Sequence, residues 1–184
     1  VTASDFVWSW MRILTASLGS QYPDMLYYLE GAEEYHTWVS KEEIKKMMES
    51  EENPDILSSL EESFLNHKPK PSFDTVGVKA IDEHTLKVNL KSPTPFFLGL
   101  LSHYSTWPVH KDTVLKHGAI DDRNGQWTRP GNFVCNGPFK LKSWELNNKI
   151  VVEKNPNYWD AEKVSLNEMH FYPVSNVMTE DRMF

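Results

Sequence analysis

Apolar residues near the start of the chain recur with the three- and four-residue spacing of an amphipathic helix. The first series occupies residues 6–14, and Thr2 with Asp5 makes a capping-box-like start just before it. We expect this helix to end at Gly19, because glycine readily takes the left-handed conformation that closes a helix. A second helix is predicted from Pro23, since the first helical turn tolerates proline. Its apolar face comprises Met25, Leu26, Leu29 and Ala32.

The block 36–72 has a different pattern, which predicts a helical insertion. Ser40 and Glu43 have the spacing of a capping box for a helix over residues 41–48. The sequence Asn53-Pro54-Asp55 begins a further helix, because asparagine caps a helix well and proline suits its first turn. The apolar positions of that helix are Ile56, Leu57, Leu60, Phe64 and Leu65. A proline-containing run at 68–71 closes the block, since such runs are extended and stiff.

From residue 76 the apolar period changes to two, which is typical of β-strands. Residues 76–80 and 86–90 are predicted to form a hairpin around a turn at 82–84. A short helix is expected from Pro95 through Leu101, and another over 111–117.

The last third of the chain is predicted to be rich in strands. Residues 139–144 pair with 150–154 across the turn 146–148, and 166–172 is a last strand candidate. The chain therefore has a mixed α/β (α+β) pattern, with a helix-rich N-terminal half and a strand-rich C-terminal half.

The composition is that of an ordinary globular protein, with 40% hydrophobic and 24% charged residues in a chain of 184. A net charge of -7 without clustered positive charge argues against nucleic acid and anionic membranes as partners. No run of about 18 apolar residues is present, so we expect no membrane-spanning helix. Cys135 is the single cysteine, which excludes an intramolecular disulfide and a zinc cluster built from cysteines.

Motifs typical of hydrolases, metalloproteases and nucleotide-binding proteins are absent from the sequence, so we expect neither an enzyme nor a cofactor or metal site. His103, His110 and His117 recur every seven residues, as the ligands of a metal on one helix face would. Pro108 prevents the continuous helix that would align the first pair. We therefore interpret them as surface histidines.

Three further features have a structural interpretation as well as a functional one. Cys135 is interpreted as a small buried residue rather than a nucleophile. The segment 121–125 faintly resembles a calcium loop but lacks its distal glutamate, so we expect a polar loop. The aromatic residues of the first helices are expected to pack mainly in the core, while a subset lines a cleft. They are Trp8, Trp10, Tyr22, Tyr27, Tyr28 and Tyr35.

Several stretches, in order, resemble the family 5 solute-binding proteins, the oligopeptide- and dipeptide-binding receptors of ABC importers. They are VTASDFVWSWMR at 1–12, VGVKAIDEHTLKVNLKSPTPFF at 76–97, and the run from Trp127 that contains WTRPGNFVCNGPFKLKSW and KIVVEKNPNYWDA. FYPVSNVMTEDRMF at 171–184 matches the family's following strand and helix start. Together they cover well over half of the chain. We interpret Asn136-Gly137-Pro138 and Asn155-Pro156 as structural signatures, with the Tyr158 and Trp159 rings packed against the sheet.

The resemblance implies a two-lobed clamshell that encloses a peptide between its lobes. Residues 1–106 would belong to the smaller extra α/β domain of the family, with the helical insertion at about 36–72. Residues 107–184 would belong to the first lobe, which is discontinuous in sequence. The chain starts without an export signal or an initiator Met and stops without a turn signal, so we expect an internal piece of a longer protein.

The resemblance further implies reversible peptide capture and delivery to the permease of an ABC transporter, without chemistry and without a cofactor. Such receptors are periplasmic or anchored by lipid to the cell surface. In the family, an aromatic residue of the small domain faces the cleft, and the resemblance places Tyr22 at that position. Tyr22 is the only ligand contact of the family that the resemblance assigns to this sequence. The insertion at 36–72 could shape a lid or lie outside, and we favour the outside.

Alternatives remain at this point. Some relatives in the family carry nickel complexes, haem or oligosaccharides, and the aromatic content is compatible with sugars. A hydrolase that uses Cys135 and a scaffold that docks a partner through residues 36–72 belong to other classes of protein.

Overall fold

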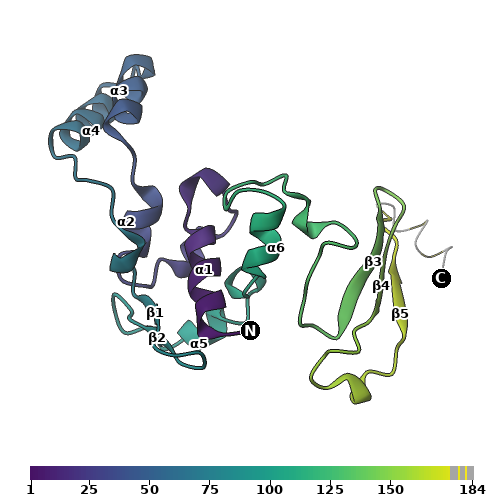
Figure 1. Cartoon of the computed structure of the whole chain (residues 1–184). Helices are drawn as coiled ribbons and strands as arrows, with labels where there is room; N and C mark the ends of the chain where they lie inside the picture. The colour runs from purple at the N-terminus through teal and green to yellow at the C-terminus, as the bar shows by residue number, and fades with distance from the viewer. Residues whose placement is uncertain (175–177, 179–180, 182–184) are drawn as a thin grey trace. The chain divides into compact units, whose positions relative to one another are not determined.

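The computed structural model describes residues 1–174, 178 and 181. The chain folds into two units, Val1–Pro108 and Val109–Phe184 (Figure 1). The division falls two residues after the predicted domain boundary, and the assignment of each unit to a domain of the family stays a prediction. Within the described residues no helix is long and apolar enough to cross a membrane.

Helix α1 (Ala3–Ile13) forms the centre of the first unit. Its predicted capping box is present, because the Asp5 carboxylate accepts the backbone N–H of Thr2 at 2.7 Å. The helix ends before Gly19, contrary to the prediction. Thr15 takes an extended conformation and donates its hydroxyl to the Met11 carbonyl oxygen at 2.9 Å, and Gly19 closes a separate 3₁₀ helix, η1 (Ala16–Leu18).

The predicted second helix is wrong as one continuous element. The chain forms a 3₁₀ helix, η2 (Pro23–Leu26), and then α2 (Ala32–Thr37). Between them Leu29 bridges Leu90 in antiparallel fashion, and the Tyr28 carbonyl oxygen accepts the Lys91 N–H at 2.9 Å. Gly31 then takes a φ of 66°, which favours glycine. Pairing with a distant segment therefore overrides the local helical pattern.

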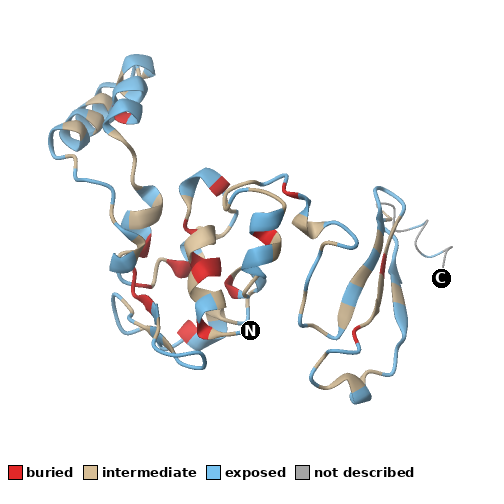
Figure 2. Ribbon diagram, in the orientation of Figure 1, coloured by how far each residue is buried: buried red, intermediate tan, exposed pale blue. Residues whose placement is uncertain are grey.

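Helices α3 (Lys41–Ser50) and α4 (Pro54–Leu65) confirm both helices predicted in the insertion. Ser40 caps α3 in the predicted capping box, and the Asn53 side chain accepts backbone N–H groups at the start of α4. The two helices pack against each other. Ile44 is the buried hydrophobic residue of this pair, so most of the pair's surface is exposed (Figure 2).

Strands β1 (Val78–Ala80) and β2 (Leu86–Val88) confirm the first predicted hairpin, with Val78 opposite Val88. The hairpin packs on α1. A short helix, α5 (Phe97–Leu100), and the 3₁₀ helices η3 (Phe73–Thr75) and η4 (Tyr104–Thr106) complete the first unit. Its core gathers residues from α1, the η2–α2 region, the hairpin and α5 (Figure 2). The buried members are Trp10, Leu14, Leu26, Leu29, Ala32, Val76, Val78 and Phe97.

The second unit contains α6 (Lys111–Lys116), two 3₁₀ turns, η5 (Gln126–Thr128) and η6 (Ala161–Lys163), and an antiparallel sheet in the order β3–β4–β5. The strands β3 (Phe139–Glu145), β4 (Lys149–Lys154) and β5 (Glu168–Phe171) confirm the predicted strand-rich end. The predicted helix start within residues 171–184 lies largely outside the described residues.

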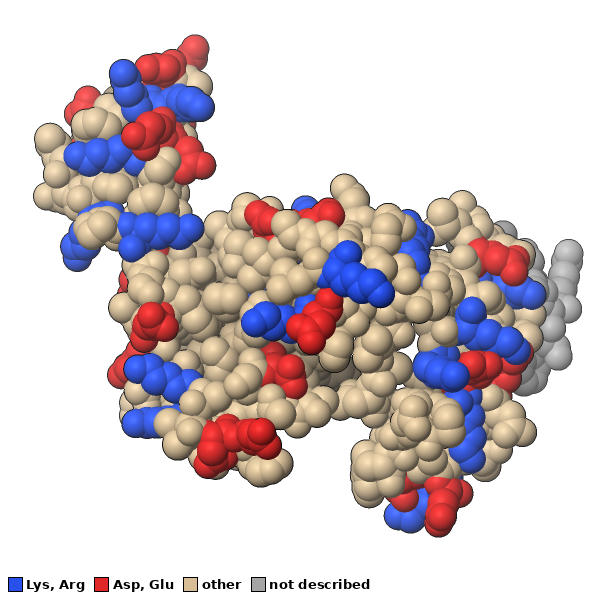
Figure 3. Space-filling model, in the orientation of Figure 1, with Lys and Arg blue, Asp and Glu red and all other residues tan. Residues whose placement is uncertain are grey.

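The sheet of the second unit has one apolar and one charged face. A bulge at Lys142 shifts the register of β3 against β4, so Leu141 pairs with Val152 while Ser143 pairs with Val151. On the charged face, ion pairs join Lys140 to Glu153 and Lys142 to Glu168, and the His170 ring is hydrogen-bonded to Glu168. Acidic and basic side chains are also interspersed over the visible molecular surface (Figure 3). Neighbouring opposite charges across strands help to fix the register.

Candidate ligand-binding site

Tyr22 lies in a cluster of three rings within the first unit. It precedes η2, and its ring meets the rings of His103 and Tyr104 edge-on, with centroid distances of 5.2 and 5.9 Å. His103 and Tyr104 stack on each other at 4.3 Å with an interplanar angle of 31°. Tyr22 is half-buried, whereas Tyr104 is 58% exposed. We call these three residues the aromatic cluster.

The backbone of η4 fixes the orientation of His103. Its ring Nδ1 accepts the Ser105 backbone N–H at 3.4 Å and lies 2.8 Å from the Ser105 hydroxyl oxygen. Because Nδ1 accepts a hydrogen bond, the neutral imidazole carries its proton on Nε2. The cluster therefore offers a ring N–H donor beside two tyrosine hydroxyls.

A buried hydrogen bond anchors η4 to the core. The indole Nε1–H of Trp10 donates to the Thr106 carbonyl oxygen at 2.9 Å, and Trp10 is 1% exposed. The Thr106 hydroxyl in turn donates to the carbonyl oxygens of Leu101 and His103 at 3.0 and 2.9 Å. Helix α1 thus holds the short segment that presents two rings of the aromatic cluster.

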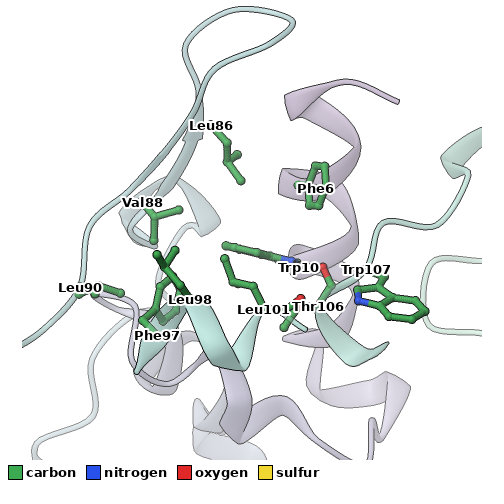
Figure 4. Close-up of a pocket in the computed structure, with 10 residues that line it drawn as sticks. All are labelled: Phe6, Trp10, Leu86, Val88, Leu90, Phe97, Leu98, Leu101, Thr106 and Trp107. Carbon is green, nitrogen blue, oxygen red and sulfur yellow. Dashed lines mark hydrogen bonds between the residues drawn. The ribbon is translucent and has the colours of Figure 1, made fainter. Parts of the chain in front are cut away.

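An apolar pocket of about 340 Å³ includes the anchoring residues Trp10 and Thr106 in its lining. Side chains from α1, the hairpin, α5 and η4 surround it (Figure 4). They are Phe6, Trp10, Leu86, Val88, Leu90, Phe97, Leu98, Leu101, Thr106 and Trp107. The size is at the lower end of pockets that hold small molecules, and the lining offers few polar groups to orient a ligand.

The three periodic histidines have separate roles. His103 caps η4, His110 caps the start of α6 by accepting the Thr113 N–H at 3.3 Å, and His117 follows the last residue of α6. Over the described part of the chain, no group of three potential metal-ligating side chains comes together.

Cys135 and the acidic loop lie in the second unit. The Cys135 thiol donates to the Phe139 carbonyl oxygen at 3.3 Å, and the residue is half-buried rather than buried as expected. Asp122 accepts the Asn124 N–H at 2.8 Å, which makes a local turn of the polar loop.

The asparagine-proline motifs have the structural role that the sequence predicts. Asn155 is 5% exposed, its side-chain amide donates to the Gly137 carbonyl oxygen at 2.9 Å, and its backbone N–H donates to the Pro138 carbonyl oxygen. The expected packing of Trp159 on the sheet is wrong, because the residue is 83% exposed. The turn that follows Asn155 directs this ring outward, where it contacts Tyr158 at 5.7 Å.

The aromatic residues near the start of the chain pack mainly in the core, as expected, whereas the lining of a cleft by a subset stays a prediction. Trp8 and Trp10 are buried, while Tyr27, Tyr28 and Tyr35 are half-buried against the core. Tyr22 differs because its described ring contacts are with the 103–104 segment. Sequence reasoning missed His103 and Tyr104 as its neighbours, because a separation of about 80 residues leaves no local signal.

The overall fold has close counterparts among solved receptors. A periplasmic oligopeptide-binding protein from Borrelia burgdorferi has a TM-score of 0.74 and 33% sequence identity, over 100% of this chain and 29% of its own. The Haemophilus influenzae oligopeptide-binding protein in complex with the peptide RPPGFSPFR has a TM-score of 0.73 and 27% identity, over 99% and 29%. These neighbours are two-lobed periplasmic peptide-binding proteins.

Sequence comparison gives the family. The pattern of the bacterial extracellular solute-binding proteins, family 5 middle region, matches residues 1–184. The periplasmic oligopeptide-binding protein of Salmonella typhimurium is 34% identical over 180 residues, which are 98% of this chain and 27% of that protein. The chain belongs to the family 5 solute-binding proteins, and it spans little more than a quarter of these relatives.

Proposed function

We propose that this chain is part of the substrate-binding component of an ABC peptide importer. Such a component captures oligopeptides or dipeptides reversibly and delivers them to a membrane permease. The observation that carries the proposal is the match of residues 1–184, from end to end, to receptors named for oligopeptide binding, one of them in complex with a nonapeptide. We place the receptor in the periplasm or, with a lipid anchor, on the cell surface.

Tyr22 is the proposed ligand contact of this segment. Its half-buried ring is held edge-on by two other rings, so little side-chain entropy remains to be lost when a peptide binds. Tyrosine also combines a large apolar surface with a hydroxyl that can reach the peptide backbone. The remaining contacts would come from polypeptide outside this segment, since the chain spans only 27% of the Salmonella receptor.

Binding requires no chemical step in this proposal. The relatives are named as binding proteins, and Cys135 uses its thiol as a donor to a backbone carbonyl rather than to a base. Closure of two lobes around a peptide would bury it from water, and the closed form would be recognised by the permease.

Calorimetric titration tests the proposal. The receptor that contains this segment should bind peptides of two to nine residues with micromolar or tighter affinity, and residues 1–184 alone should not. Tyr22→Ala in the receptor should weaken binding roughly five- to thirtyfold, as expected for a central aromatic contact. Tyr172→Ala, a half-exposed tyrosine of the second unit, is the matched control.

Two results would contradict this proposal, one concerning the ligand and one concerning the extent of the binding site. Tighter binding of a nickel complex, haem or an oligosaccharide than of any peptide would assign a different ligand. Micromolar peptide binding by the isolated 184 residues would show that the site does not need the rest of the receptor.

A further inference from the structure

Tyr104 is the most exposed ring of the aromatic cluster. It stands on η4, stacks on His103 at 4.3 Å and meets Tyr22 at 5.9 Å and 84°. Although 58% of the residue is exposed, these two contacts and the Trp10 anchor of η4 hold it in place. A large aromatic surface that is both exposed and fixed is suited to ligand contact.

Interaction with Tyr22 and burial raise the pKa of Tyr104 above its ordinary value. The largest cause is a side-chain hydrogen bond with Tyr22, and the second is burial of the hydroxyl. A tyrosine hydroxyl is protonated at neutral pH, so the Tyr104 ring meets the Tyr22 ring edge-on without carrying a charge. The exposed surface that Tyr104 adds beside Tyr22 is therefore that of a neutral aromatic ring.

We infer that Tyr104 is a specificity-determining residue of this site. Its ring lies against Tyr22 and offers an uncharged aromatic surface, which favours peptides with an aromatic or aliphatic side chain at that point over peptides with a charged one. The inference rests on the proposed function. Burial of a charged side chain against such a surface costs free energy unless the charge is paired, whereas an apolar ring or chain gains contact area.

The test compares peptide preference rather than affinity alone. Calorimetry with tripeptides that differ only in the central residue, Phe, Leu, Lys or Asp, would be run on the complete receptor and on its Tyr104→Ser variant. We expect Tyr104→Ser to weaken binding of the Phe and Leu peptides about three- to tenfold, the range of one aromatic contact. Binding of the Lys and Asp peptides should change less than about twofold on the same scale. The Tyr104→Phe variant keeps the ring and should keep most of the preference for Phe and Leu.

Tyr172→Ser is the matched control, because Tyr172 is also half-exposed and also lies beside a histidine, His170, in the second unit. It should leave all four affinities unchanged. An equal loss of affinity for all four peptides in Tyr104→Ser would overturn the inference, because a merely structural role lowers the fraction of receptor that can bind without altering its preference among peptides. No loss of affinity for any peptide would overturn it as well. If the unaltered receptor binds none of the peptides, the proposed function itself fails, which is a distinct result.

Discussion

Replacement of Trp10 by phenylalanine should destabilise the first unit substantially. Trp10 is 1% exposed, and its indole N–H donates to the Thr106 carbonyl oxygen at 2.9 Å. Phenylalanine lacks two ring carbons of the indole, worth about 1.6 kcal/mol at about 0.8 kcal/mol for each buried carbon. The carbonyl oxygen left without its donor adds about 1–3 kcal/mol. We therefore expect a loss of about 2.6–4.6 kcal/mol in the free energy of unfolding.

Urea denaturation monitored by circular dichroism measures this loss. With a slope of about 2 kcal/mol per molar urea, the midpoint should fall by about 1–2 M. Trp107→Phe is the matched control, because Trp107 is 58% exposed and should change stability by less than about 0.5 kcal/mol. Hydrogen exchange should also become faster in the segment 104–107. A loss below about 1 kcal/mol in Trp10→Phe, or equal losses in both variants, would refute the role of the indole as the anchor of η4.

Two other predictions concern each unit separately. In the second unit, hydrogen bonds lower the pKa of Glu168 in the folded state, mainly the one from Lys142 and secondly the one from His170. This carboxylate therefore contributes stability at a pH above its unfolded pKa, and that stability is lost as the pH falls through the folded pKa. Glu168→Gln should flatten this acidic part of a plot of urea midpoint against pH, and an unchanged plot would contradict the assignment. In the first unit, Gly31→Ala should cost about 1–3 kcal/mol, because φ is 66° and an added Cβ would lie 2.8 Å from a backbone oxygen. Gly99→Ala, where an added Cβ meets nothing within 4 Å, is the control, and similar midpoints for the two variants would show that Gly31 is not constrained.

The relation between the insertion and the binding site stays a prediction. Helices α3 and α4 pack on each other and contribute no residue to the core cluster of the first unit, which favours a position outside the site. Deletion of residues 36–72 from the receptor, followed by peptide titration and a pull-down for partners, separates a decoration from a lid or a docking element.

The sequence alone determined the helix starts and hairpins that depend on neighbouring residues. The starts of α1, α3 and α4 follow from capping residues within three positions of each helix, and both hairpins follow from alternation and a turn. These features depend on neighbours in the sequence, so the sequence alone predicts them. The ordered motifs also indicated the family that the comparisons establish.

Only the tertiary structure decided the features that depend on distant segments. Pairing of Leu29 with Leu90 divided a predicted helix in two, because backbone hydrogen bonds to another part of the chain outweighed a local preference. The solvent position of Trp159 followed from a turn rather than from its apolar character. The candidate site also combines both kinds of information. The sequence suggested Tyr22 through a family resemblance. The contact of Tyr22 with His103 and Tyr104 depends on the tertiary structure, because the anchored 3₁₀ helix η4 lies beside η2 in the folded unit.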